Sequence, residues 1–109
     1  MTADLHLHST YSDGSYTPED LVKKSLKKGF TTIAIADHDT VEGIPLAEKA
    51  SESLAIEVIP AIEFSTFRGK AEIHILGYFI DYNNQELLTE TKKIFSAREN
   101  RAKKIVKLL

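Results

Sequence analysis

The sequence predicts an α/β fold in which parallel strands are covered by helices. Short apolar strand patterns alternate with amphipathic helix patterns, in the order strand, helix, strand, helix, strand. Residues 31–40 (TTIAIADHDT) begin with an almost continuous apolar run, which is typical of a strand buried on both faces of its sheet. These two observations together indicate a parallel sheet or barrel.

The first strand is expected at residues 3–8 (ADLHLH), where apolar and polar residues alternate. Successive side chains of a strand point to opposite faces, so His6 and His8 lie on one face and the leucines on the other. Two imidazoles on one face pack poorly in an apolar core, but they are good metal ligands.

Two helices are expected beside the central strands. The first has Thr17 as its N-cap and Pro18 at its first helical position, and Gly29 ends it. Its inward stripe is Leu21, Val22, Ser25 and Leu26. The second helix is expected at residues 41–53, with Thr40 as its cap.

The remaining elements are two or three strands and a long helix. Residues 55–67 predict one or two strands, depending on whether Pro60 interrupts them, and residues 71–80 predict another strand. An amphipathic helix is expected at residues 84–109, with an apolar side formed by Leu87, Leu88, Ile94, Phe95, Ile105, Val106 and Leu109. So few strands cannot close a barrel, which takes about 200 residues or more, so we expect residues 1–109 to be one part of a larger domain.

Composition limits the classes of function. The chain has 109 residues, of which 42% are hydrophobic and 28% charged, as in an ordinary globular domain. Its net charge of -2 excludes binding of nucleic acid by charge alone. Cysteine is absent, so any metal must be held by nitrogen and oxygen atoms. There is neither a signal peptide nor an apolar run of about 18 residues, so we expect a cytoplasmic protein with no membrane partner.

The polar residues that can carry chemistry gather on the expected strands and at their ends. All four histidines lie there, at His6, His8, His38 and His74. Carboxylates accompany them at Asp4, Asp13, Asp37, Asp39 and Glu63. Mixed imidazole and carboxylate ligands suit Zn, Mn or Fe better than Ca or Mg, and Glu63 is the candidate for a carboxylate that bridges two ions.

Each of these residues also has a simpler interpretation when it is taken alone. Asp13 precedes a glycine and fits a turn, Glu63 fits an exposed strand position, and His74 fits a core histidine. Asp37 and Asp39 flank His38 either as loop residues or as groups that orient imidazoles by hydrogen bonds. The coincidence of four histidines with four strand positions favours a metal site, but it does not name a reaction.

Four motifs in order resemble those of the PHP family (polymerase and histidinol phosphatase). They are DLHLHSTYSDG, IADHDTVEG, AIEFS and EIHILGYFID, and they extend from Ala3 to about Tyr82. The tail SARENRAKKIVKLL is similar to the helix that follows in stand-alone members. DHDTVEG and HILGYFID are most similar to the stand-alone nucleotide phosphoesterases.

The resemblance implies the N-terminal part of a distorted (β/α)7 barrel, with residues 1–109 as the N-terminal part of a PHP domain. The family's later ligand motifs, a further histidine and a terminal Asp-x-His, are absent from this sequence. The resemblance also implies two or three divalent ions of Mn, Fe or Zn. The first would be held by His6 and His8, the second by Glu63 and His74, and the third by Asp13 and His38; phosphate would be contacted by Arg98 and Arg101.

The implied activity is hydrolysis of a phosphate ester by a metal-bound hydroxide, with Asp13, His38 and Glu63 as catalytic residues. The substrate would be a small phosphorylated molecule, a nucleotide or a short oligonucleotide end, and the site would need a further C-terminal segment. Two alternatives stay open. One is a non-catalytic metal-binding PHP module, for example with a DNA polymerase. The other is a barrel hydrolase of amide bonds, which the DHD motif and the position of Asp13 disfavour.

Overall fold

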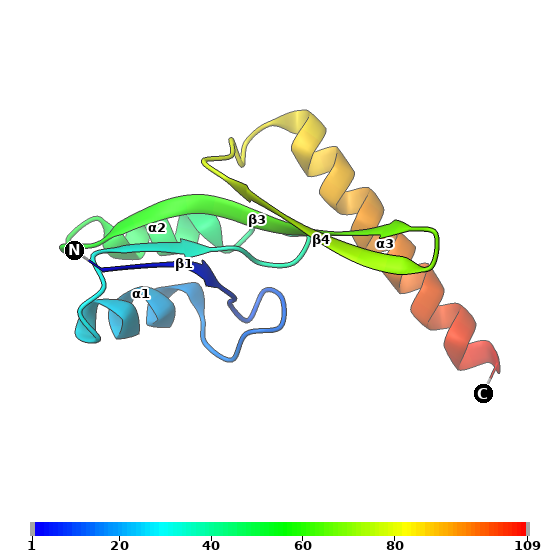
Figure 1. The fold of residues 1–109 in the computed structure, drawn as a ribbon, viewed down its shortest axis with the longest axis horizontal. Coiled ribbons are helices and arrows are strands. Elements are labelled where there is room, and N and C mark those ends of the chain that lie inside the picture. The colour runs from blue at the N-terminus through cyan, green and yellow to red at the C-terminus, as the bar shows by residue number, and fades with distance from the viewer. Residues whose placement is uncertain (1, 109) are drawn as a thin grey trace.

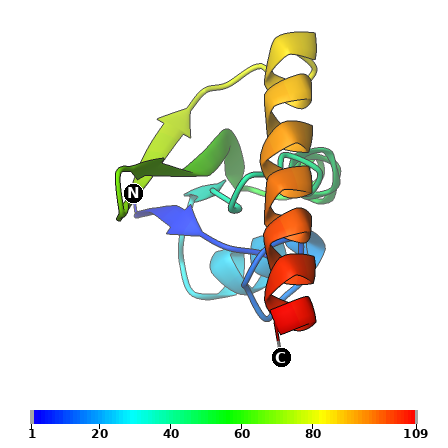
Figure 2. The same ribbon diagram turned by 90° about the vertical axis from the view of Figure 1, so that its right-hand side faces the viewer.

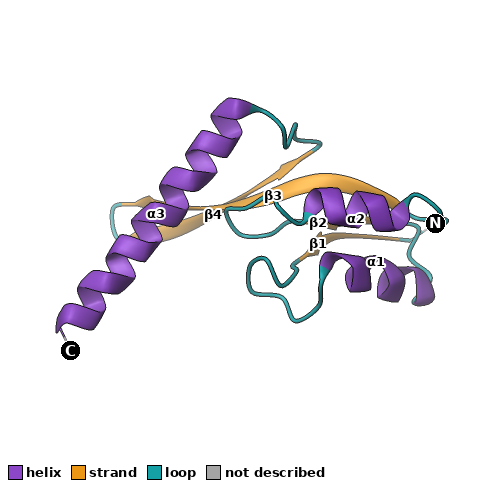
Figure 3. Ribbon diagram, turned by 180° about the vertical axis from the view of Figure 1, so that it is seen from behind, coloured by secondary structure: helices purple, strands orange, loops and turns teal. Residues whose placement is uncertain are grey.

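The chain forms a four-stranded sheet with helices packed on one of its faces (Figures 1 and 3). The structure is a computed structural model that describes residues 2–108, without the side chains of residues 67, 95, 98, 99 and 101–108. Its elements in chain order are β1 (Ala3–Leu7), α1 (Pro18–Lys27), β2 (Thr32–Ile35), α2 (Ile44–Ser51), β3 (Glu57–Arg68), β4 (Ala71–Tyr78) and α3 (Gln85–Leu108).

The sheet is mixed, with the strand order β1-β2-β3-β4. β1 pairs parallel with β2, and β2 parallel with β3, which confirms the parallel arrangement expected for the first three strands. β4 differs, because it pairs antiparallel with β3. No helix separates these two strands, and the short turn between them contains Gly69 at φ 65°, so the chain can only turn back as a hairpin.

β3 is one uninterrupted strand, so Pro60 does not divide residues 55–67 into two strands. Residues 57–60 pair with β2 and residues 61–68 with β4. Pro60 therefore lies where the partner of β3 changes, and its missing N–H disturbs neither ladder. Its carbonyl is used, because it accepts a hydrogen bond of 2.8 Å from the backbone N–H of Phe79, just beyond β4.

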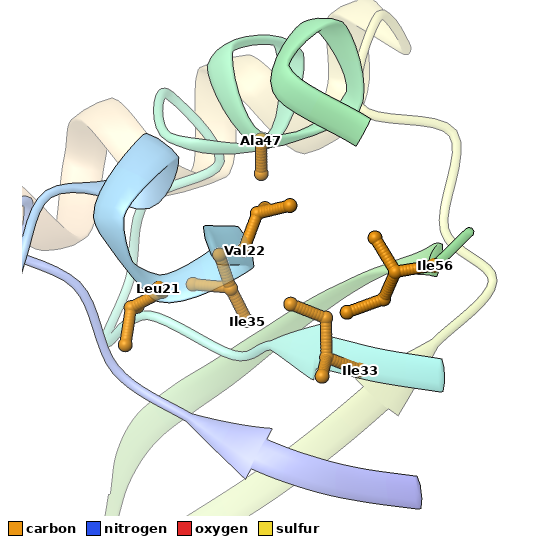
Figure 4. Close-up of a cluster of buried hydrophobic side chains, with 6 residues drawn as sticks. All are labelled: Leu21, Val22, Ile33, Ile35, Ala47 and Ile56. Atoms are coloured by element: carbon orange, nitrogen blue, oxygen red, sulfur yellow. The ribbon is translucent and has the colours of Figure 1, made fainter. Parts of the chain in front are cut away.

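α1 follows its predicted signals closely. The Thr17 side chain accepts a hydrogen bond from the backbone N–H of Asp20 at 3.2 Å, and Gly29 lies beyond the end of the helix with φ +92°. Figure 4 shows the core between this helix, α2 and the sheet, which is formed by Leu21, Val22, Ile33, Ile35, Ala47 and Ile56.

α2 begins three residues later than expected, and the prediction of Thr40 as its cap is wrong. Gly43 is the N-cap, while Thr40 Oγ1 accepts from the backbone N–H of Glu42 in the preceding turn. Pro45 explains the shift. In a helix that began at residue 41, its ring would oppose the carbonyl of residue 41, whereas in the first turn no partner for its nitrogen is needed.

The sheet is curled, so that its two edge strands approach each other. Tyr78 in β4 donates a hydrogen bond of 2.8 Å from its hydroxyl to the carbonyl of Leu5 in β1. The face away from α1 and α2 carries small buried side chains at Ala34, Ala36 and Ala61, which leave room for the curl.

α3 stands at the end of the molecule toward which β1 and β2 point (Figures 1 and 2). Its first turn is capped by Asn84, whose side-chain oxygen accepts from the backbone N–H of Leu87 at 3.0 Å. Leu87 and Leu88 then pack against the buried cluster of Val41, Ile44 and Ile62. Among the described residues, no helix is both long and apolar enough to cross a membrane.

The packing of the core predicts the effect of truncating a side chain in β2. Ile33 is fully buried between the sheet and the helices, so we expect Ile33→Ala to lower the free energy of unfolding by about 2–5 kcal/mol. Ile75→Ala, at a strand position that is 53% exposed, is the matched control and should change it far less. Urea unfolding followed by circular dichroism measures both, and equal losses for the two variants would contradict this packing.

Candidate metal centre

The predicted ligands meet on the sheet face opposite to α1 and α2. Alternation along the extended chain carries the side chains of residues 34, 36 and 38 to one face, so His38 continues the row begun by the two buried alanines. The backbone joins this segment to β3, because Glu63 N donates to Asp37 O at 3.1 Å and Asp39 N donates to Glu63 O at 3.0 Å. Glu63 and His38 are thereby held side by side.

Glu63 is the centre of the cluster, and histidines of both edge strands reach it. His6 Nε2 donates to Glu63 Oε1 at 2.6 Å, and His8 Nε2 lies 3.3 Å from the same oxygen. His74 Nδ1 lies 3.0 Å from the other oxygen, Oε2. Both carboxylate oxygens therefore face imidazole nitrogens, which is the arrangement that a bridging ligand needs.

Asp13 forms a second contact group with His8 and His38. Its Oδ2 lies 3.3 Å from His38 Nε2, and its Oδ1 lies 3.5 Å from His8 Nδ1. The rings of His8 and His38 stack, with centroids 4.6 Å apart and planes inclined by 12°. Asp13 comes from the loop after β1, so this group joins a loop carboxylate to two strand-end imidazoles.

The six predicted ligands fall into three overlapping triads, whose candidate ligand atoms lie within 4.8 Å of one another. The triads are His6–His8–Glu63, His8–Asp13–His38 and His38–Glu63–His74. Glu63 belongs to two of them. The Nδ1 atoms of His8 and His38 are buried and make no hydrogen bond among the described residues, which leaves them available to an ion. This donor set fits divalent ions such as Mn, Fe or Zn.

The charge state of Glu63 suits a ligand rather than a proton donor. Burial raises the pKa of this carboxyl. The hydrogen bond from His6 and the positive charges of His38, His6 and His8 lower it by more, so the net pKa lies below its usual value. Glu63 is therefore an ionised carboxylate at neutral pH.

Asp37 holds the loop that carries Asp13. Its carboxylate accepts hydrogen bonds from Ser9 N at 2.6 Å, from Ser9 Oγ at 2.5 Å and from Ser12 Oγ at 2.9 Å. The contacts described for Asp37 are with Ser9 and Ser12, and its predicted role in orienting an imidazole stays a prediction. Gly14 completes the loop, since an added Cβ would lie 2.0 Å from the carbonyl oxygen of His8.

The other two aspartates contact backbone groups. Asp4 Oδ1 accepts from the backbone N–H of His6 at 3.2 Å, which supports the backbone of this ligand rather than its ring. Asp39 has a left-handed backbone with φ +56°, and its Oδ1 accepts from Ser65 N at 2.8 Å. It thus fixes the turn after His38 to the neighbouring strand.

Two further residues of this region had no predicted role in the site. Glu72 Oε1 lies 3.4 Å from His74 Nε2, and Tyr78 ties β4 to β1. Both share a strand face with His74 by alternation, which was the available signal. The predicted phosphate contacts of Arg98 and Arg101 lie outside the described residues, since the side chains at these positions are not described.

Comparison with known proteins gives consistent matches. A family model described as "PHP domain" matches residues 4–107. The 5'-3' exoribonuclease Rnm of Escherichia coli is 41% identical over 97% of this chain and 37% of its own length. The 3',5'-nucleoside bisphosphate phosphatase of Chromobacterium violaceum is 31% identical over 94% of the chain and 36% of its own length.

A solved structure shares the fold. It is the crystal structure of a putative metal-dependent phosphoesterase from Bifidobacterium adolescentis, with a TM-score of 0.88 and 32% sequence identity. The match covers 96% of this chain and 37% of that one. The chain thus spans little more than a third of the length of these three proteins.

The overlap of the triads predicts unequal losses of metal. Glu63→Ala removes a ligand from two triads and Asp13→Ala from one, so we expect Glu63→Ala to lower the bound Mn or Zn more. Glu57→Ala, at an exposed end of β3 and in no triad, is the control. Elemental mass spectrometry after dialysis against each metal measures the ions per chain. Equal metal content in all three variants and the wild type would contradict the assignment.

The Asp37 contacts predict a loss of stability. Asp37→Asn replaces the charged carboxylate, which accepts three hydrogen bonds, by a neutral amide. We therefore expect the free energy of unfolding to fall by about 1–3 kcal/mol. Glu57→Gln, at an exposed end of β3, serves as the matched control. Thermal and urea unfolding without metal measure the difference, and an Asp37→Asn variant as stable as the control would show that these bonds do not hold the loop.

Proposed function

The chain belongs to the PHP domain family, and on that premise we propose that it forms part of a metal-dependent phosphoesterase. The substrate would be a phosphate ester of a nucleotide or of an oligonucleotide end, and the protein would act in the cytoplasm, where such molecules are turned over. The single observation that carries the proposal is Glu63, a buried carboxylate whose two oxygens face His6 in β1, His8 directly after β1, and His74 in β4.

The relatives support the substrate class. The matched relatives are named for cleavage of RNA and for removal of phosphate from a nucleoside bisphosphate. Both names imply attack on a phosphate ester of a nucleotide or of RNA. Since the chain spans little more than a third of those proteins, its activity on such a substrate is our proposal.

Two or three divalent ions of Mn, Fe or Zn would occupy the triads, with Glu63 shared between two of them. Bound ions of this kind neutralise charge on phosphate oxygens and lower the pKa of water. Each triad offers only three ligand atoms. We propose that a segment of the protein outside these residues supplies the others.

The exposure of the ligands sets the side from which a phosphate would enter. The side chains of Glu63, His8 and His38 are 8%, 21% and 18% exposed, so they form the floor of the site. Asp13, His6 and His74 are 66%, 49% and 42% exposed and form its rim. The phosphate would therefore approach from the rim, while the floor holds the ionised Glu63 away from bulk water.

The proposal predicts that Glu63→Gln abolishes hydrolysis, because the neutral amide is a poor bridge between cations. We expect kcat on a 5'-phosphorylated oligoribonucleotide to fall by at least about 100-fold, the upper end of what changes around metal ligands usually cost. Chelation should remove the activity of the wild type, and added Mn should restore it. The assay uses the protein at its full natural length, with Glu57→Gln as control.

The alternative, a metal-binding module without catalysis, predicts a different result. Glu63→Gln would then lower the melting temperature and the metal content, but the wild type would hydrolyse no phosphate ester under any metal. That outcome would reject the phosphoesterase.

A further inference from the structure

The carboxylate of Glu72 lies beside His74, a predicted metal ligand two residues further along β4. Alternation along the strand places both side chains on the face of the metal centre. Glu72 Oε1 lies 3.4 Å from His74 Nε2, whereas His74 Nδ1 lies 3.0 Å from Glu63 Oε2. The two ring nitrogens of His74 therefore face two different carboxylates, one inside the triads and one outside them.

The position of one proton decides which nitrogen of His74 can bind a cation. A neutral imidazole carries a proton on one nitrogen and a lone pair on the other. Nδ1 is the nitrogen that faces Glu63, the carboxylate shared by two triads. For Nδ1 to act as the ligand atom, the proton has to stay on Nε2, which is the nitrogen beside Glu72.

We propose that Glu72 is a positioning residue that keeps this proton on Nε2 and so presents the lone pair of Nδ1 to the metal ion. The inference rests on the metal centre of the proposed function. Histidines that bind metals commonly donate their other N–H to a carboxylate, which fixes the ring and makes the imidazole a stronger ligand. Glu72 has no place in the three triads, so its contribution is to act through His74.

The contact has room to shorten. Its length of 3.4 Å exceeds the range of about 2.7–3.2 Å for an N–H···O hydrogen bond. The side chains of Glu72 and His74 are 47% and 42% exposed, so both can change rotamer at little cost. A cation on Nδ1 withdraws electron density from the ring and makes the Nε2–H a stronger donor. We therefore expect the hydrogen bond to form fully when the ion binds.

The neighbours of His74 on this face offer no equivalent acceptor. Ser65 lies opposite His74 in the β3–β4 register, and its buried hydroxyl makes no hydrogen bond within the described part of the chain. Leu76, the next residue on the same face of β4, has an apolar side chain. Among the described ion pairs, His74 Nε2 has Glu72 as its partner and no second carboxylate.

The first test separates a hydrogen-bond acceptor from a negative charge. Mn binding to the protein at its full natural length is titrated by electron paramagnetic resonance of the free ion. We expect Glu72→Ala to raise by about tenfold the Kd of the site that His74→Ala impairs. Glu72→Gln keeps an oxygen acceptor without the charge, so it should keep a Kd near that of the wild type. Equal rises in Glu72→Gln and Glu72→Ala would overturn the proposal.

Glu57→Gln is the matched control for the loss of one carboxylate, because Glu57 lies at an exposed end of β3 and in no triad. Its Kd for Mn should equal that of the wild type. The double variant shows whether Glu72 acts through His74. In a His74→Ala background, Glu72→Ala should leave the Kd unchanged, since the imidazole that it positions is gone. A tenfold rise in that background as well would overturn the proposal.

The second test observes the proton directly and needs neither metal nor hydrolysis. Nitrogen-15 NMR of histidine-labelled, metal-free protein at alkaline pH, where histidines are neutral, distinguishes the two tautomers. The His74 signals are those that His74→Ala removes. We expect the Nε2–H tautomer in the wild type and a larger share of Nδ1–H in Glu72→Ala. Identical tautomer ratios in the two proteins would overturn the proposal.

Failure of the proposed function would be recognised separately. A wild-type protein that binds Mn but hydrolyses no phosphate ester rejects the phosphoesterase, while the Kd values still decide the role of Glu72. If the wild type binds no Mn, the metal centre itself is rejected, and the proposal for Glu72 is overturned with it.

Discussion

The ionised carboxylate of Glu63 is the constraint on which the rest of this site depends. A buried charge without partners costs several kcal/mol, so it must be compensated by nearby donors. Here the compensation comes from His6 and His8 at one edge of the sheet and from His74 at the other. These edges are separated by two strands, so the sheet has to curl before the charge is satisfied. The Tyr78–Leu5 hydrogen bond spans the same gap and supports the same curvature.

The curl in turn depends on which side chains occupy each face. Large residues such as Ile33 and Ile35 face the helices, whereas Ala34 and Ala36 face the metal centre. A shift of one residue in the pairing of β4 would carry His74 to the opposite face and leave Glu63 Oε2 without its partner. The hairpin turn at Gly69 helps to prevent that shift, because it sets the register of β3 and β4.

Local patterns predicted the features that depend on neighbouring residues in the chain. The cap at Thr17 and the shared face of His6 and His8 follow from spacing alone, and the structure has the cap where it was expected. The antiparallel pairing of β4 did not follow, since strand direction depends on the connection and not on periodicity. The sequence indicated that Asp37 lies near the site, but it did not identify Ser9 as its hydrogen-bond partner. The two residues are 28 positions apart, so no local pattern connects them. The metal ligands share one region of the structure, but their role stays a prediction.

The charges around the centre explain why metal ions would be needed for binding as well as for chemistry. The carboxylates of Asp13, Glu63 and Glu72 face the four histidines between them, and none of the ion pairs described there includes a lysine or arginine. A phosphate that approached this face would therefore meet mainly negative charge, and a chain with a net charge of -2 provides no general attraction. Divalent ions in the triads would reverse the sign of the local field. On this argument the acidic residues recruit the cations, and the cations recruit the phosphate.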